Sequence, residues 1–243
     1  MPPAFGQRSA SPFCLKAEMA LTHLGFDFTI QENMELRKSP KRKPWLEDNG
    51  KVVADSDLVL RYLNTKTNGG LLDQLSPQQR CIGTSFVRLA EDHLYWLILA
   101  SRWLDDDWFV NIQRGFFGSL PTHIGWLISR MARMQMRFFY RLHDGLGRHC
   151  RAEQIQLLRN DLDAIAGQVC AEGFITGPEL CVYDFGVAAM LATGIDNTPE
   201  TWVSEIANGY TELRDYAEKV QERVGVYSRF QPHDELRPIL LKR

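Results

Sequence analysis

Two serine residues stand where the sequence predicts the first turn of a helix, and their position indicates anion binding. Ser11 precedes Pro12, and Ser56 follows Asp55. Serine and aspartate are preferred residues at a helix start, and proline is favoured at the first helical position. The N–H groups of a helix start lack partners and favour negative charge. A hydroxyl at Ser11 can therefore donate a hydrogen bond to a bound thiolate and lower the pKa of that thiol.

A basic run followed by a proline adds a third feature to these helix starts. Pro44 follows Lys41-Arg42-Lys43 and opens a short apolar stretch. A cis bond before this proline would leave the Lys43 backbone free to pair with an extended peptide. The N–H groups and hydroxyl at Ser56 suit a carboxylate, whereas Asp55 suits an ammonium group. The set indicates a site for a short thiol peptide with a free amino-acid end.

The elements that would position these residues follow one another within the first 66 residues. Residues 12–24 have the apolar spacing of a helix, and Gly25 is a natural stop. Residues 26–30 alternate apolar and polar side chains, as a half-buried strand does. Asn49-Gly50 between two short apolar runs predicts a hairpin, because both turn residues tolerate positive φ. The order of helix, strand, hairpin and helix predicts most of a small α/β layer.

The rest of the chain, from Ser76 onward, reads as helices joined by loops. The two adjacent glycines in residues 65–70 indicate a linker, and Ser76-Pro77 marks the next helix start. Amphipathic stripes of this kind are buried in a helical bundle. Further helices are predicted over residues 81–104, 124–142, 152–169, 184–193 and 202–224.

Composition excludes several classes of protein. The 243 residues include 28 Lys and Arg against 30 Asp and Glu, for a net charge of −2. This balance argues against a nucleic-acid-binding protein, which needs clustered positive charge. The five cysteines form no C-x-x-C pair, which favours reduced thiols in the cytoplasm and no metal site. No apolar run approaches the roughly 20 residues of a membrane span.

Each candidate residue also has a purely structural interpretation. Ser11 can serve only as a helix cap, and the same holds for Asp55-Ser56. Cys14 lies one turn beyond Ser11 and is either a redox thiol or a buried structural cysteine. The helix predicted over residues 124–142 carries four arginines along one side. They form either a solvated face or a surface for an anionic ligand or partner. These are Arg130, Arg133, Arg137 and Arg141.

Several motifs, in a consistent order along nearly the whole chain, resemble the glutathione transferase superfamily. The segment PWLEDNGKVVADSDLVLRYL resembles its third strand, hairpin and acidic-Ser helix start, and Ser11-Pro12-Phe13-Cys14 resembles its Ser and Cys class catalytic turn. The segment FITGPELCVYDFGVAAML resembles its buried helix, capped here by Asp184. EDHLYW, RWLDD and GLGRHCRAEQ resemble the branch that also holds metaxins and failed-axon-connections proteins.

The resemblance implies a fold, a ligand and roles for particular residues. It implies a thioredoxin-like domain over residues 1–70 that binds glutathione, and an all-helical domain over residues 76–243. Ser11 would stabilise the glutathione thiolate for attack on a small electrophile or for removal of a leaving group. Glutathione would contact Lys43, Pro44, Asp55 and Ser56. Candidate contacts to the second substrate, bound between the domains, are Tyr95 and Arg102.

The sequence departs from the family pattern at three places. The residue before the key proline is usually apolar but here is Lys43, and the usual Ser or Thr cap of the buried acid is Cys181. The family's central first strand has no counterpart, because residues 1–6 contain two prolines that lack a ladder donor. We expect either that the true start lies upstream or that this domain is degraded. A strand within residues 1–6, paired on both sides, would contradict this expectation.

The missing strand also favours a second class of function. A broken sheet would misplace the loop with Ser11, so the fold can instead serve as a non-catalytic binding or adaptor module, as in metaxin-like relatives. A third alternative is an intact family member that accepts another thiol or none. By resemblance we also expect a cytoplasmic protein that forms a homodimer. Family membership names no electrophile, since residue identity in such a pocket does not encode a substrate.

Overall fold

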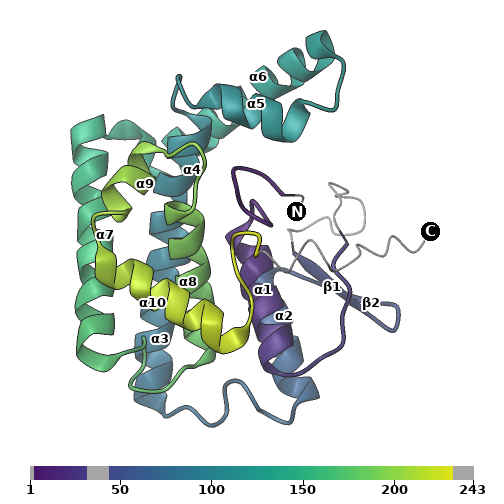
Figure 1. Ribbon diagram of the computed structural model, residues 1–243, viewed down its shortest axis with the longest axis vertical. Coiled ribbons are helices and arrows are strands. Elements are labelled where there is room, and N and C mark those ends of the chain that lie inside the picture. The colour runs from purple at the N-terminus through teal and green to yellow at the C-terminus, as the bar shows by residue number, and fades with distance from the viewer. Residues whose placement is uncertain (1–2, 32–43, 232–243) are drawn as a thin grey trace.

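The computed structural model describes residues 3–31 and 44–231, which form a small α/β layer beside a larger helical bundle (Figure 1). The layer contains α1 (Pro12–His23), β1 (Trp45–Asp48), β2 (Lys51–Ala54) and α2 (Ser56–Lys66). The helical part contains α3 (Pro77–Arg88), η1 (Leu89–Leu94), α4 (Tyr95–Trp103), α5 (Phe109–Phe117), α6 (Thr122–Phe139), η2 (Tyr140–Asp144), η3 (Leu146–Arg148), α7 (Arg151–Glu172), α8 (Val182–Ile195), α9 (Trp202–Ala207) and α10 (Thr211–Val224).

The predicted hairpin is confirmed, and its turn has the expected chemistry. β1 and β2 pair antiparallel, with Trp45 opposite Ala54. Asn49 and Gly50 both have positive φ, at 49° and 81°. Two successive residues of this kind form the type of turn whose twist matches that of the flanking strands. The hairpin leads directly into α2, and so fixes where that helix begins.

The prediction of a strand over residues 26–30 is wrong. Phe26 and Phe28 are half-buried and their neighbours are exposed, but the sheet of the described residues contains only β1 and β2. A strand needs a neighbour to take up its N–H and C=O groups. Between residues 3 and 11 the chain makes a turn, bridged at Ala4 and Gln7, in the place of the central strand that the family resemblance implies. Residues 26–30 therefore lack that neighbour.

The N-terminal turn packs against the helical bundle. The Phe5 ring lies 4.9 Å from the ring of Trp108 and 5.2 Å from that of Phe116, edge-on to both. The amide of Gln7 donates to a backbone carbonyl of α8 at 3.0 Å. Apolar contacts with α5 and a hydrogen bond to α8 thus hold the segment that leads into α1.

One continuous apolar core joins the α/β layer to the bundle, and α8 runs through it. Every residue of α8 from Asp184 to Ile195 is buried. α1 packs across α8, with Met19 and Ala20 fully enclosed. The helical spacing of apolar residues in α1 therefore serves this interface with the bundle as well as the contact with α2.

The buried acid of α8 is a structural cap. The Asp184 carboxylate accepts hydrogen bonds from the backbone N–H groups of Ile175 and Cys181 and from the hydroxyl of Tyr216, at 2.8–2.9 Å. Burial raises the pKa of Asp184, and the three donors oppose that rise. Burial also raises the pKa of the Cys181 thiol to about 12, so this cysteine stays protonated at neutral pH.

The predicted helices are present with two changes. Within residues 81–104, a π-helical turn at Leu89–Leu94 joins α3 to α4. The prediction of one helix over residues 202–224 is wrong, because α9 ends at Ala207 and α10 begins only at Thr211. Asn208 and Gly209 lie in the gap, and both are poor residues for a helix interior.

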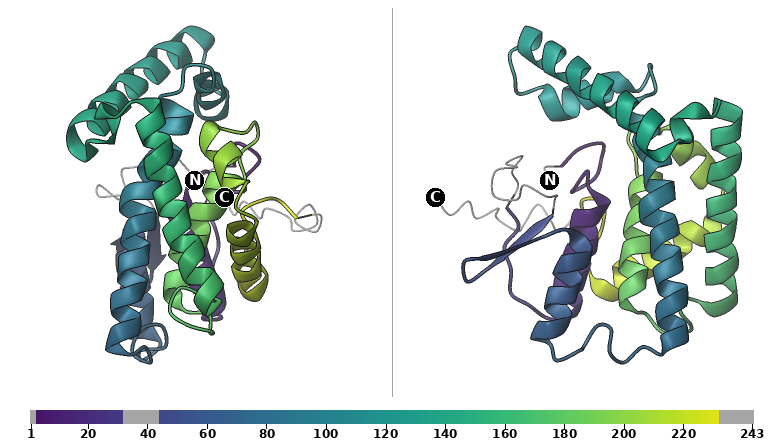
Figure 2. Two further views of the ribbon diagram at one scale, coloured as in Figure 1. Left: turned by 90° about the vertical axis from the view of Figure 1, so that its left-hand side faces the viewer. Right: turned by 180° about the vertical axis from the view of Figure 1, so that it is seen from behind.

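α5 and α6 project from the bundle as a separate arm, which is clear when the molecule is seen from the side and from behind (Figure 2). The interpretation of the α6 arginines as a solvated face is correct only in part. Arg133 turns inward and donates to the backbone carbonyls of Trp103, Leu104 and Asp105, each at 2.9 Å. The carbonyls of Trp103 and Leu104 lie at the C-terminal end of α4, where a cation is favourable.

Candidate functional site

The starts of α1 and α2 lie side by side. Ser11 precedes the first turn of α1, and Ser56 opens α2. Lys16 of α1 contacts the Asp57 carboxylate, in the first turn of α2, at 2.5 Å. Both helices run in the same direction (Figure 1). Two helix N-termini, with their positive dipole ends, therefore face the same side of the layer.

Asp55 has a strained backbone at this point. Its φ of 86° and ψ of 131° are unusual for a residue with a side chain. Its carboxylate accepts the N–H of Asp57 at 3.0 Å, and its own N–H donates to the carbonyl of Pro44 at 3.0 Å. Such strain costs about 1–3 kcal/mol and is concentrated at ligand-binding and active sites. The structure thus brings together Pro44, Asp55 and Ser56, whereas Lys43 and the bond that joins it to Pro44 lie outside the described residues.

Ser11 is not used as a helix cap. Its backbone is extended, and its side chain makes no capping hydrogen bond to α1. The residue is buried, with 7% of its surface exposed. Ser9 holds the turn instead, because its hydroxyl accepts the Ser11 N–H and donates to the Ser11 carbonyl. The structure leaves the Ser11 hydroxyl without a capping role, and Cys14, one turn on, is half-buried.

Arg102 anchors the loop that carries Ser11. Its guanidinium is buried and donates to Asn197 Oδ1 at 2.7 Å, to the Thr193 carbonyl at 2.6 Å and to the Ala10 carbonyl at 3.4 Å. Burial lowers the pKa of Arg102 to about 10, which still leaves it charged at neutral pH. With these donors engaged, Arg102 positions the turn that carries Ser11, and its contact with a second substrate stays a prediction.

Tyr95 lies where the α/β layer meets the bundle. Its ring packs edge-on against Phe13, two residues after Ser11, with 5.0 Å between the ring centroids. It also packs against the neighbouring Trp96 at 5.6 Å. The structure therefore places Tyr95 beside the start of α1, and its contact with a second substrate stays a prediction too.

A buried ion network joins the two helix starts to the bundle, and sequence reasoning missed it. The Lys16 side chain is 3% exposed and contacts the carboxylates of Asp57 and Glu91, at 2.5 and 2.6 Å. Arg88 contacts the second oxygen of Asp57. Burial raises the pKa of Glu91 despite the lysine beside it. The sequence does contain a sign of this network, because Lys16 lies on the apolar face of α1 with Met19 and Ala20, at helical spacing.

Asp57→Asn is expected to destabilise the protein at neutral pH but not at low pH. Burial disfavours the Asp57 carboxylate, but Lys16 and Arg88 outweigh it and lower its pKa below the ordinary 3.8. As the pH falls, the unfolded state takes up this proton first, so the stabilisation is present above pH 3.8 and is lost as the pH falls through the folded pKa. Urea titrations from about pH 7 to about pH 3 measure the effect. A difference between wild type and variant that persists unchanged at the acid end would contradict it.

Other features of the described residues lie away from these helix starts. A hollow of about 300 Å³ lies at the opposite end of α1, against His23, Gln79 and Thr176. It lies away from Ser11 and from the start of α2, so we do not include it in the site. The described part of the chain contains no cluster of three or more metal-binding side chains. None of its helices combines the length and the apolar character that crossing a membrane would require.

The chain resembles known proteins over most of its length. It matches the family described as the glutathione S-transferase N-terminal domain over residues 12–108. It is 29% identical to the isoprene-epoxide–glutathione S-transferase of Rhodococcus sp. (strain AD45), across 92% of this chain and 97% of that protein. It is 25% identical to Failed axon connections of Drosophila melanogaster, across 76% of this chain, but it spans only 46% of that protein.

Solved structures show the same architecture. A delta-class glutathione transferase of Nilaparvata lugens superposes with a TM-score of 0.57 and 15% identity, across 88% of this chain and 86% of that one. This likeness confirms the predicted fold class, a thioredoxin-like layer followed by a helical domain, in which the described sheet retains two strands. The family match and the relatives, on a shared fold, support the glutathione S-transferase superfamily as the family of this chain.

Proposed function

We propose that this protein binds glutathione at the starts of α1 and α2 and activates its thiol. The observation that carries the proposal is the strained Asp55, held by Pro44 at the start of a helix whose first turn contacts α1. The N–H groups at the start of α2 and the Ser56 hydroxyl would bind the carboxylate of the γ-glutamyl end, and Asp55 would bind its ammonium group. The backbone at Lys43 and Pro44 would pair with the cysteinyl part of glutathione.

Ser11 would supply the chemical activation. Its hydroxyl would donate a hydrogen bond to the glutathione sulfur and so favour the thiolate, the nucleophilic form. With an epoxide, the sulfur would form a bond to a ring carbon, the bond from that carbon to oxygen would break, and the oxygen would take a proton from water. Arg102 would keep the Ser11 turn in place, and Tyr95 would border the space for the electrophile.

An epoxide is the first electrophile class to test, because the Rhodococcus relative is named for isoprene epoxide and covers nearly the whole chain. We expect the full chain to consume glutathione in the presence of a small alkyl epoxide faster than buffer alone does. Mass spectrometry of the product should show the sum of the two reactants, as in an addition. A rate equal to that of buffer across several epoxides would contradict conjugation to this class.

The arrangement of the whole molecule is part of the proposal. We assign glutathione binding to residues 1–70 and the space for the electrophile to the face that residues 76–243 turn toward them. By analogy with the family, the protein would be cytoplasmic and would form a homodimer.

The second candidate is a non-catalytic binding or adaptor protein. Two observations favour it: the turn in residues 3–11 replaces a strand next to the site, and Ser11 is buried. Such a protein could bind glutathione without turnover. Glutathione binding with no conjugation or reduction, for any electrophile class, would favour this second candidate.

A further inference from the structure

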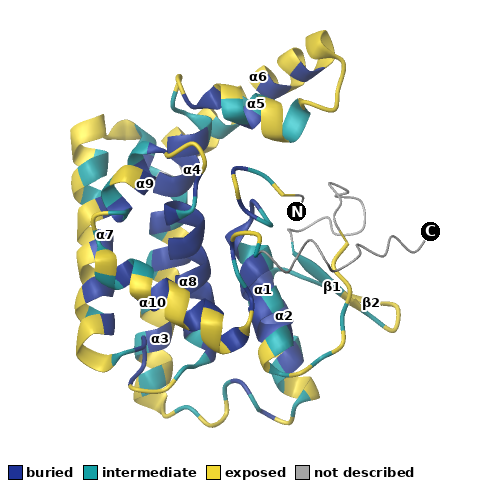
Figure 3. Ribbon diagram, in the orientation of Figure 1, coloured by how far each residue is buried: buried dark blue, intermediate teal, exposed yellow. Residues whose placement is uncertain are grey.

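The arm of α5 and α6 presents an apolar face to solvent. Much of α6 is exposed along its length (Figure 3). Six of its apolar side chains repeat at helical spacing and are 41–68% exposed: Ile124, Leu127, Ile128, Met131, Met134 and Phe138. We call these six residues the outward face of α6. The opposite side of the helix, with Gly125 and Ser129, is buried. A continuous apolar face of this kind on a globular protein marks an interaction site.

Positive charge runs along one flank of this face. Arg130, Arg137 and Arg141 are all exposed and follow one another at intervals of seven and four residues. Residues 122–142 hold four of the chain's 28 Lys and Arg and none of its 30 Asp and Glu. An otherwise slightly acidic protein thus carries one helix with only cationic charge. This concentration of positive charge on one helix favours an anionic partner.

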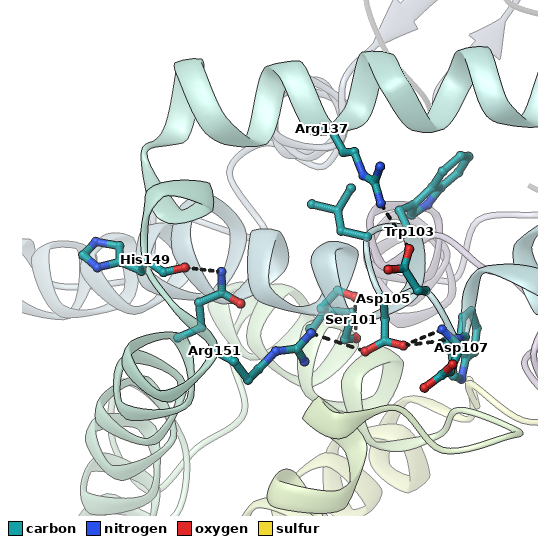
Figure 4. A network of polar contacts seen from close by, with 12 residues as sticks. Ser101, Trp103, Asp105, Asp107, Arg137, His149 and Arg151 are labelled. Atoms are coloured by element: carbon teal, nitrogen blue, oxygen red, sulfur yellow. Dashed lines mark hydrogen bonds and ion pairs between the residues drawn. The ribbon is translucent and has the colours of Figure 1, made fainter.

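Ion pairs connect the base of the arm to the bundle. Arg151 of α7 contacts the Asp105 carboxylate at 3.3 Å, and Arg137 contacts that of Asp106 at 3.2 Å. Figure 4 shows Arg137 and Arg151 reaching from two different helices toward the loop that carries Asp105 and Asp107. Together with the bonds from Arg133 to the end of α4, these contacts hold the outward face of α6 away from the core.

A hollow between α5 and α6 also combines apolar side chains with arginines. It has a volume of about 410 Å³, and Trp126, Met131 and Met134 line it together with Arg130 and Arg137. The Arg130 guanidinium lies 5.0 Å from the centre of the Trp126 ring. Apolar walls beside guanidinium groups suit an amphiphile with an anionic head, such as a phospholipid.

We infer that α6 docks this protein on a membrane surface that contains anionic phospholipid. The helix lies parallel to the surface, its outward face enters the boundary between head groups and acyl chains, and the flanking arginines contact lipid phosphates. Its 18 residues span about 27 Å at 1.5 Å per residue, enough to lie along the surface. Pairing of this face with the same face of a second copy would place Arg130 and Arg141 of one copy near those of the other, which like-charge repulsion disfavours.

Sedimentation of the full chain with lipid vesicles tests this inference. We expect binding to vesicles of phosphatidylcholine with about 30% phosphatidylserine, binding that weakens as salt increases, and little binding to phosphatidylcholine alone. Trp126 should shift its fluorescence to shorter wavelength on binding, and Trp126→Phe should remove that part of the shift. Replacing Arg130 and Arg141 by Gln should weaken binding about five-fold for each arginine.

Matched variants elsewhere control for charge and apolar area. The double variant Leu127→Gln/Phe138→Gln should abolish vesicle binding, whereas Leu58→Gln on α2 and Arg159→Gln on α7 should bind as wild type does, since both residues are exposed far from the arm. Circular dichroism should show all variants folded. Equal binding to neutral vesicles would overturn the inference, as would vesicle binding that the arm variants leave intact. Absence of binding, with a dimer that Leu127→Gln/Phe138→Gln disrupts, would assign the face to a second copy.

Discussion

Ser11→Ala is expected to lower kcat/KM for glutathione conjugation about 10- to 100-fold. A hydrogen bond to a charged group contributes about 1.5–3 kcal/mol, and each 1.4 kcal/mol is a factor of ten. The fold should survive, because the Ser11 side chain makes no capping hydrogen bond to α1. The pKa of the bound glutathione thiol should rise in the variant, which a pH profile of kcat/KM for the electrophile measures at saturating glutathione.

Cys14→Ala is the matched control for this prediction. It lies in the same first turn of α1 and would carry the chemistry if the site worked by a protein thiol. We expect this variant to retain turnover. Loss of activity in Cys14→Ala together with normal activity in Ser11→Ala would reverse the assignment and make Cys14 the reacting group.

Lys16→Met is expected to destabilise the protein by about 3–5 kcal/mol. Its ammonium group is buried between Asp57 and Glu91, and removing one partner of a buried ion pair leaves uncompensated charge. Because the network joins α1, α2 and the π-helical turn of η1, the variant should also loosen the two helix starts and weaken glutathione binding. Urea titration measures the free energy of unfolding.

Two further variants separate lost charge pairing from lost side-chain contact. Lys66→Met removes an exposed ion pair with Asp48 and should leave stability unchanged within error, since surface pairs contribute little. Adding Glu91→Gln to Lys16→Met should recover part of the loss, because one stranded carboxylate is gone. A loss for Lys16→Met no larger than that for Lys66→Met would show that the buried network does not stabilise the fold.

Local chemistry made much of this fold predictable from the sequence. Asn49-Gly50 forms a turn because both residues accept positive φ, and Ser76-Pro77 begins a helix because capping and a fixed φ act within a single turn. The Asp184 carboxylate likewise accepts the N–H of a neighbour three residues away, Cys181. Such signals lie within a few residues of the structure that they determine.

Features that depend on distant partners were less predictable. Residues 26–30 have the alternation of a strand but lack the neighbour that would make them one. Arg133 has the spacing of a solvated residue, yet it binds carbonyls about thirty residues away in the sequence, at the end of α4. Arg102, a candidate contact of the second substrate, also donates to carbonyls of α8 and Ala10 that its sequence position did not indicate. Motif and periodicity do not encode these pairings.

The candidate site also combines features that local sequence predicts with features that depend on distant partners. The helix start at Asp55-Ser56 follows from the hairpin before it, and the structure adds a strained backbone that no pattern indicated. The ion pairs of Lys16 depend on the packing of α1 against α2 and η1, which lie far apart in the sequence. Sequence therefore identified the groups that would meet the ligand, and the structure identified the residues that position them.

Isothermal titration of glutathione into the full chain tests the central claim most directly. We expect a single saturating heat, and Ser56→Ala should raise Kd about 10- to 100-fold because a bond to the bound carboxylate is lost. Ser76→Ala is the control, since it removes a serine from the start of α3 instead and should leave Kd unchanged. No heat from the folded wild-type protein, or equal affinity in the two serine variants, would contradict a glutathione site at the starts of α1 and α2.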